Sequence, residues 1–154
     1  MALLNEVFSA FDSLADKYGL EKIKTIGDAY MAVAGVPEPS STHASAAARM
    51  ALEMLTVVSR FTRDTGEPLS LRLGLNSGPL VAGVIGTKKF IYDLWGDTVN
   101  TASRMESHGS IGHIQVTEAT RDLLESEFVF SPERWIEVKG KGQMRVYTLL
   151  GPRE

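Results

Sequence analysis

The stretch K-T-I-G-D-A-Y-M, residues 24 to 31, places a Gly-Asp pair between two apolar, strand-like runs. Glycine adopts a positive φ without strain and aspartate tolerates turn geometry, so this pair is typical of a β-hairpin tip. The pattern predicts two paired strands, Leu20 to Ile26 and Asp28 to Val33. Ahead of them, apolar residues at helical spacing from Leu4 to Tyr18 predict a helix that Gly19 caps.

Helices and strands mix irregularly in the rest of the chain. One apolar stripe at helical spacing predicts a helix packed on the core, formed by Ala47, Met50, Ala51, Met54, Leu55, Val58 and Phe61. Alternating and branched apolar residues predict strands over 69–75, 80–86, 113–116, 128–138 and 144–149. Two further helices are expected, one capped by Asp97 and one opened by Thr117. Glycine-tipped hairpins favour antiparallel pairing, so the predicted fold class is α+β.

Composition narrows the functional classes. The 154 residues suggest one domain with a sizeable core, and the absence of cysteine excludes thiol catalysis, disulfides and cysteine-based zinc sites. His43, His108 and His113 lie far apart and show no metal-ligand spacing. A net charge of −3 argues against general nucleic-acid binding. No apolar run approaches the roughly 20 residues of a membrane span, so we expect a cytoplasmic domain without membrane contact.

A few polar residues are candidates for anion binding. Asn100 and Arg104 are four apart on a predicted helix, so both face the same side. A guanidinium there would hold a phosphate, and the carboxamide would place a hydroxyl. Arg72 stands on the polar side of a leucine-rich strand, and Lys139 and Lys141 flank glycines that permit close approach of an anion. Taken singly, each also fits an ordinary surface residue.

The order of the motifs narrows the choice. Five runs follow one another along the chain: K-I-K-T-I-G-D-A-Y-M from Lys22, L-R-L-G-L-N-S-G from Leu71, A-G-V-I-G from Ala82, Y-D-L-W-G-D-T-V-N-T-A-S-R-M-E from Tyr92, and V-K-G-K-G from Val138. Together they closely resemble class III nucleotidyl cyclases over nearly the whole chain. The resemblance implies one catalytic domain over residues 1–154, with a ferredoxin-like βαββαβ core and additional elements.

The resemblance also implies a substrate and a metal site. Asp28 matches a metal-binding carboxylate, in a site for two divalent ions, Mg²⁺ or Mn²⁺. Lys24 and Asp93 match the pair that recognises adenine in adenylate cyclases, whereas guanylate-type relatives carry Glu and typically Cys there. The expected substrate is therefore ATP.

The remaining roles follow the same resemblance. Arg104 matches the arginine that stabilises phosphate charge in the transition state, and Asn100 matches the asparagine that orients the ribose. Arg72 and Lys139 match phosphate-binding positions. The expected reaction is attack of the ribose 3′-oxygen on the α-phosphate, which gives cyclic AMP and pyrophosphate.

The family's head-to-tail pairing implies a homodimer whose active sites lie across the interface. Lys24, Asp93, Asn100 and Arg104 would come from one subunit, and Asp28 and Arg72 from its partner. The family's first metal-binding aspartate precedes the first helix, in an F-x-D-I-x-G-F-T-like segment that these residues lack. We therefore expect the first strand to be missing and this chain itself to be weakly active or inactive.

Two other functions compete with the cyclase. A catalytically silent, cyclase-like dimerisation or regulatory module would explain the missing aspartate, although the later motifs all remain. A single-strand RNA-binding domain would share the ferredoxin-like core, but no aromatic-rich RNP1 run is present and the charge balance is acidic.

Overall fold

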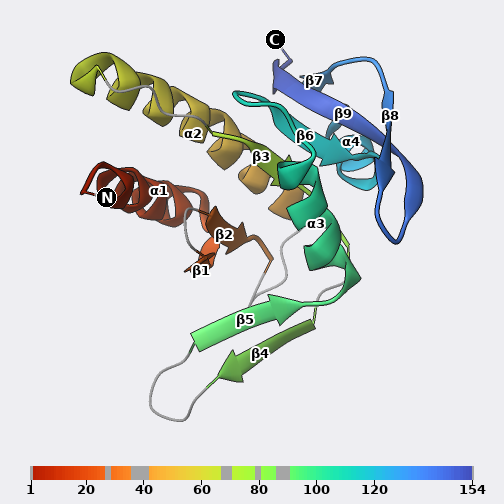
Figure 1. Ribbon diagram of the computed structural model, residues 1–154, viewed down its shortest axis with the longest axis horizontal. Helices are drawn as coiled ribbons and strands as arrows, with labels where there is room; N and C mark the ends of the chain where they lie inside the picture. The colour runs from red at the N-terminus through yellow and green to blue at the C-terminus, as the bar shows by residue number, and fades with distance from the viewer. Residues whose placement is uncertain are drawn as a thin grey trace. The chain divides into compact units, whose positions relative to one another are not determined.

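The computed structural model describes residues 2–26, 29–35, 42–66, 71–78, 81–85 and 91–153 (Figure 1). The chain divides into two compact units. The first comprises Met1–Ser70 and Val81–Leu94, and the second comprises Leu71–Leu80 and Trp95–Glu154. The single domain expected from the sequence stays a prediction.

The first unit packs two helices against each other. α1 spans Ala2–Tyr18 and α2 spans His43–Thr65. The two helices contact each other, and they bury the apolar side chains Val7, Phe11, Leu14, Ala15, Ala44, Ala48, Met50, Ala51, Val57 and Val58. α1 ends as predicted, because Gly19 adopts a φ of 76°, a conformation that glycine favours.

A β-hairpin follows α1. β1 (Glu21–Ile26) pairs antiparallel with β2 (Ala29–Val33), which confirms the two predicted strands. The Tyr30 hydroxyl on β2 donates to Asp12 Oδ1 of α1 at 2.7 Å. Burial and this hydrogen bond both raise the pKa of Tyr30, so the hairpin is tied to α1 through a neutral phenol. The predicted Gly-Asp tip lies outside the described residues. A further two-stranded sheet joins β4 (Val81–Ile85) and β5 (Ile91–Trp95).

The second unit is built on a five-stranded sheet. Its strand order is β3-β6-β9-β7, with β8 also paired to β9; β3 runs parallel to β6, and the other pairs are antiparallel. The strands are β3 (Leu73–Leu75), β6 (Ile114–Thr117), β7 (Phe128–Phe130), β8 (Arg134–Val138) and β9 (Gly142–Pro152), and the helices are α3 (Asp97–Ser107) and α4 (Glu118–Leu124). The core contains the buried side chains Met105, Ile114, Val116, Leu124, Phe128, Val138 and Val146.

The observed elements confirm the α+β class and correct several details. The strand expected over 128–138 is two strands, because Pro132 between them has no N–H for a ladder hydrogen bond. The helix expected to be capped by Asp97 has Gly96 as its N-cap, at a φ of 112°, so Asp97 is instead the first residue of the helix. Thr117 does cap α4, accepting from the Thr120 N–H at 3.4 Å.

Two strand lengths and one pairing also differ from expectation. β3 is three residues long, and it pairs parallel to β6 although hairpins suggested antiparallel neighbours. β9 runs from 142 to 152, longer than the predicted 144–149. Among the helices of the described ranges, none combines the length and apolar character needed to cross a membrane.

Candidate active site

Helix α3 lies against β3 at a glycine. A Cβ at Gly74 would stand 2.2 Å from the backbone N of Glu106 and 2.7 Å from Cβ of Met105, so only glycine permits this approach. Met105 is fully buried, and the buried Gln115 side chain donates to the Met105 carbonyl at 3.2 Å. The inner face of α3 is therefore held both by packing and by a satisfied polar contact.

The first turn of α3 is tied to the neighbouring strands by Asn76. Its Nδ2 donates to the Thr98 carbonyl at 3.0 Å, and its Oδ1 accepts from the Thr117 hydroxyl at 2.7 Å. Both ends of the Asn76 carboxamide are therefore used. Because Thr117 also caps α4, one hydrogen-bond network fixes the start of both helices.

A cavity of about 170 Å³ opens on the other side of α3. Its walls are α3 and the turn between β8 and β9. The lining residues are Asp97, Asn100, Arg104, Val138, Lys139, Gly140 and Lys141. The predicted pair Asn100 and Arg104 thus meets Lys139, which was predicted separately, in one place.

The β8–β9 turn presents two lysines to this cavity. The Lys141 N–H donates to the Val138 carbonyl at 2.9 Å, and Gly140 and Gly142 have φ values of 84° and 77°. Such a tight turn needs glycine at both positions, which explains the Lys-Gly-Lys-Gly pattern. The Lys141 ammonium pairs with the Asp97 carboxylate. Neither Arg104 nor Lys139 forms a side-chain hydrogen bond or ion pair with any described residue.

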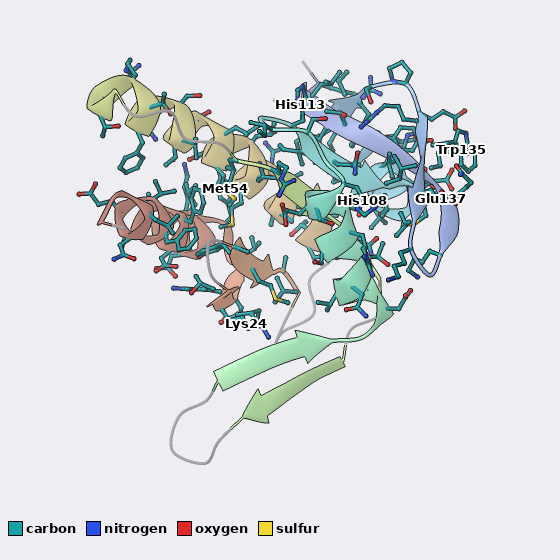
Figure 2. The ribbon with its side chains drawn as sticks, viewed as in Figure 1. Lys24, Met54, His108, His113, Trp135 and Glu137 are labelled. Carbon is teal, nitrogen blue, oxygen red and sulfur yellow. The ribbon has the colours of Figure 1, made fainter. Side chains whose placement is uncertain are left out.

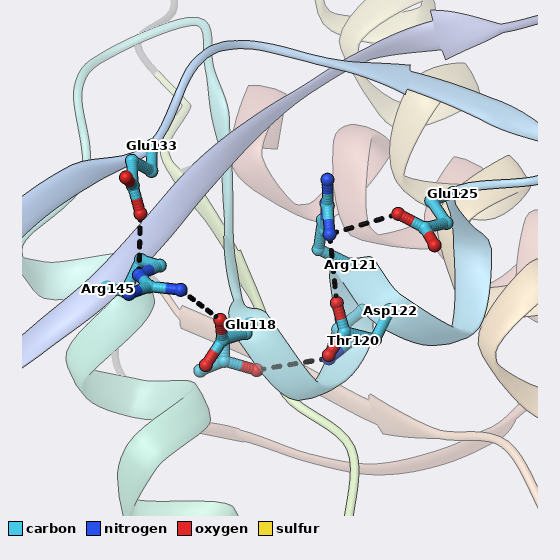
Figure 3. A network of polar contacts seen from close by, with 8 residues as sticks. Glu118, Thr120, Arg121, Asp122, Glu125, Glu133 and Arg145 are labelled. Carbon is cyan, nitrogen blue, oxygen red and sulfur yellow. Dashed lines mark hydrogen bonds and ion pairs between the residues drawn. The ribbon is translucent and has the colours of Figure 1, made fainter.

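Arg145 and Arg121 of the second unit pair with carboxylates, in contrast to Arg104. Figure 3 shows Arg145 between two carboxylates, 2.7 Å from Glu118 and 2.6 Å from Glu133. The attraction of Glu118, and then of Glu133, raises the pKa of Arg145. Arg121 pairs with Glu125 at 3.0 Å. Arg104 and Lys139 of the cavity differ from these arginines in having no carboxylate partner among the described residues.

The family of the chain follows from its sequence as a whole. The family model for the adenylate and guanylate cyclase catalytic domain matches residues 1–151. The chain belongs to this family. The resemblance drawn from the five motifs is confirmed.

Three similar proteins illustrate the range of the cyclase family. An adenylate cyclase of Mycobacterium bovis (strain ATCC BAA-935 / AF2122/97) is 50% identical over 148 residues, covering 96% of this chain and 33% of that protein. The guanylate cyclase domain of RhGC from Catenaria anguillulae, solved in complex with GTP, is 43% identical with a TM-score of 0.92, over 99% of this chain and 84% of that one.

The catalytic core of a rhodopsin-guanylyl cyclase with converted specificity, solved in complex with ATPαS, is 45% identical with a TM-score of 0.90. That likeness covers 98% of this chain and 82% of the other. This cyclase domain thus has the fold of cyclase catalytic domains, and it spans about a third of the length of the adenylate cyclases it matches.

Four further site residues were expected from the sequence: Arg72, Lys24, Asp93 and Asp28. Arg72 does not line the cavity; its Nε is 3.3 Å from Glu106 Oε2, and its Nη1 donates to the Ser107 carbonyl at 3.5 Å. Lys24 lies on β1, opposite Met31 of β2, and belongs to the first unit (Figure 2).

The last two of these residues are Asp93 and Asp28. Asp93 lies on β5, also in the first unit. Asp28, the expected metal ligand, is outside the described residues, although its hard carboxylate oxygens suit Mg²⁺ and Mn²⁺. Within the described part of the cyclase domain, no three His, Asp or Glu side chains gather to hold a metal ion.

Two lining residues, Lys141 and Asp97, had received no role from the family resemblance. Lys141 was grouped with Lys139 as an anion candidate, but only Lys139 matched a position of the cyclase family. Asp97 was interpreted as a helix cap. Their positions in the sequence could have indicated that they line the site. Lys141 shares a tight turn with Lys139, and Asp97 is the first residue of the helix that carries Asn100.

Proposed function

We propose that the protein to which this cyclase domain belongs converts ATP to 3′,5′-cyclic AMP and pyrophosphate, in a homodimer with composite active sites. The observation that carries the proposal is the grouping of Asn100, Arg104 and Lys139 around one cavity, with both cations lacking a described partner. Unpaired cations that face one space favour a polyanionic ligand. A cytoplasmic location would fit this substrate.

The size of the cavity indicates which part of ATP it would receive. Sites for whole small molecules measure roughly 300–1,000 Å³, whereas this cavity measures about 170 Å³. It therefore suits the phosphates and the adjoining ribose, and the base would bind elsewhere.

Arg104, Lys139 and Asn100 would each have a distinct task in this mechanism. The Arg104 guanidinium would bind two phosphate oxygens at once and stabilise the charge that develops on them. Lys139 would hold a phosphate as a point charge, and the Asn100 carboxamide would orient the ribose. Mg²⁺ or Mn²⁺, with Asp28 as one ligand, would supply further neutralisation of the phosphate charge. Positioning and electrostatics would carry most of the catalysis, as in other phosphoryl transfers.

Base recognition would fall to Lys24 and Asp93. An ammonium donates to a ring nitrogen of adenine, and a carboxylate accepts from its exocyclic amine. Guanine presents O6 and N1–H instead, so both contacts would be left unsatisfied, at about 1–3 kcal/mol each.

The test of the substrate is a specificity change in the intact protein. The double variant Lys24→Glu and Asp93→Cys should shift the preference of the cyclase from ATP toward GTP, measured as cyclic AMP and cyclic GMP formed with Mn²⁺. Lys22→Glu is the matched control, because Lys22 also lies on β1 but pairs with Asp12 at 3.3 Å. An unchanged ATP preference in the double variant would show that the base is recognised by other residues.

The composite site is tested by complementation. We assign Asp28 and Arg104 of one active site to different subunits. Mixing an Asp28→Ala variant with an Arg104→Ala variant would therefore create one intact site per heterodimer and restore part of the activity. Inactive mixtures in which heterodimers are demonstrated would exclude shared sites. Binding of an ATP analogue without any turnover would instead favour the silent regulatory module.

A further inference from the structure

The ion pair between Lys141 and Asp97 lies in the cavity but has no part in the mechanism above. Its two partners differ in exposure, since 29% of the Lys141 side chain is exposed against 77% of that of Asp97. The Lys141 side chain is thus the more sheltered partner, while the Asp97 side chain stands largely in solvent. An ion pair with so exposed an acid is weak and easily exchanged.

Lys141 is also close to the cations that have a role. It shares the three-residue turn 139–141 with Lys139, and both line the cavity together with Arg104. A phosphate chain that contacts Lys139 and Arg104 therefore lies within the same small space as the Lys141 ammonium. Asp97 is the one acidic residue among the seven that line this cavity.

We propose that Lys141 is a further polyphosphate-binding cation, and that Asp97 is its counter-ion until the polyphosphate displaces it. The proposal rests on the proposed function, because it assumes that the cavity receives phosphates. Asp97 would occupy Lys141 in the free protein and turn to solvent when the ligand arrives. A ligand of high charge displaces one carboxylate readily, whereas an anion of low charge competes poorly with it. The pair would thus favour triphosphates over singly charged anions.

Displacement of Asp97 from Lys141 by the polyphosphate leads to a different prediction from simple repulsion between Asp97 and the polyphosphate. If Asp97 acts by occupying Lys141, removing the carboxylate strengthens anion binding only while Lys141 is present. If Asp97 acts only as a nearby negative charge, its removal strengthens binding to the same extent without Lys141. A double-mutant cycle separates the two cases.

The experiment measures binding of inorganic tripolyphosphate by titration calorimetry at low salt, with no metal added. Lys141→Met should weaken binding about five-fold, as expected for one exposed charged contact. Asp97→Asn should tighten binding about three-fold, and it should have no effect in the Lys141→Met background. Two controls alter similar ion pairs that do not line the cavity: Lys22→Met, and Asp122→Asn, whose carboxylate lies 3.0 Å from Arg121. Both should bind tripolyphosphate like the unaltered protein.

Several outcomes would overturn the proposal. Unchanged binding by Lys141→Met would exclude Lys141 as a ligand, and equal tightening by Asp97→Asn in both backgrounds would exclude the exchange. Weakening by both single variants would mean that the pair only braces the turn. Arg104→Ala separates this inference from the proposed function. If it weakens binding while Lys141→Met does not, only the inference fails, and if it too has no effect, the cavity is not the phosphate site.

Discussion

Replacing Gly74 by alanine tests whether the close approach of α3 to β3 sets the geometry of the candidate active site. The added Cβ would stand 2.2 Å from the backbone N of Glu106, which is about 1.2 Å short of ordinary van der Waals contact at 3.4 Å. The obstructing atoms belong largely to the helix backbone and not to the end of a flexible side chain. α3 would therefore have to move away from the sheet.

The magnitude follows from two known effects. Overpacking a core costs about 1–3 kcal/mol, and a backbone obstruction places Gly74→Ala at the upper end, about 3 kcal/mol. In a chain of this size that loss lowers the melting temperature by roughly 6–12 °C. α3 also carries Asn100 and Arg104, and a displacement of about 1 Å in a catalytic group can reduce the rate about 100-fold.

The assay compares Gly74→Ala with Gly151→Ala in thermal unfolding followed by circular dichroism, and in cyclase activity. Gly151 lies on β9, where an added Cβ would meet no atom within 4 Å, so this control should be neutral or slightly stabilising. Both tryptophans of the chain, Trp95 and Trp135, belong to the second unit, so their fluorescence would follow the unfolding of that unit. If Gly74→Ala matched the control in both melting temperature and activity, the reasoning on helix packing would be wrong.

Two further predictions concern stability. Thr117→Val keeps the shape of the residue but removes its hydrogen bond to Asn76 and the cap of α4. We expect urea unfolding to show that the free energy of unfolding falls by about 2 kcal/mol. The exposed control Thr56→Val should lower it by less than about 0.5 kcal/mol. Burial, and then the hydrogen bond to Asp12, raises the pKa of Tyr30 in the folded chain above the unfolded pKa near 10.0. The neutral Tyr30 therefore contributes fully to stability below that unfolded pKa, and this contribution is lost as the pH rises toward the pKa of the folded chain. The urea midpoint should therefore fall between pH 9 and pH 11, and less steeply in Tyr30→Phe; equal slopes would show that Tyr30 does not cause the loss.

The sequence predicted the features that depend on neighbouring residues. The β1–β2 hairpin follows from Gly-Asp between two apolar runs, and the end of α1 follows from Gly19. Asn100 and Arg104 share a side of α3 because they are four residues apart. These inferences needed only backbone preferences and helical periodicity.

Contacts between distant segments were beyond such reasoning. The parallel pairing of β3 with β6 joins segments about 40 residues apart, and no turn between them indicates it. The meeting of Arg104 with Lys139 likewise depends on how the β8–β9 turn is placed beside α3. The family motifs marked each of these residues separately. Asp97 was predicted to cap α3, but its carboxylate pairs with Lys141 of the same β8–β9 turn.

The two faces of α3 show how the cyclase domain would maintain a cluster of cations. Arg104 and Lys139 repel each other while no anion is bound, so bringing them together destabilises the folded chain. The opposite face of the helix offers compensation, because Met105 is fully buried there and Gly74 lets the backbones approach closely. Truncating a fully buried methionine costs about 2–5 kcal/mol, which is larger than the repulsion of two partly exposed charges. A helix held this firmly on one side would present Arg104 to the phosphates with little reorganisation, the condition under which electrostatic stabilisation of a transition state is most effective.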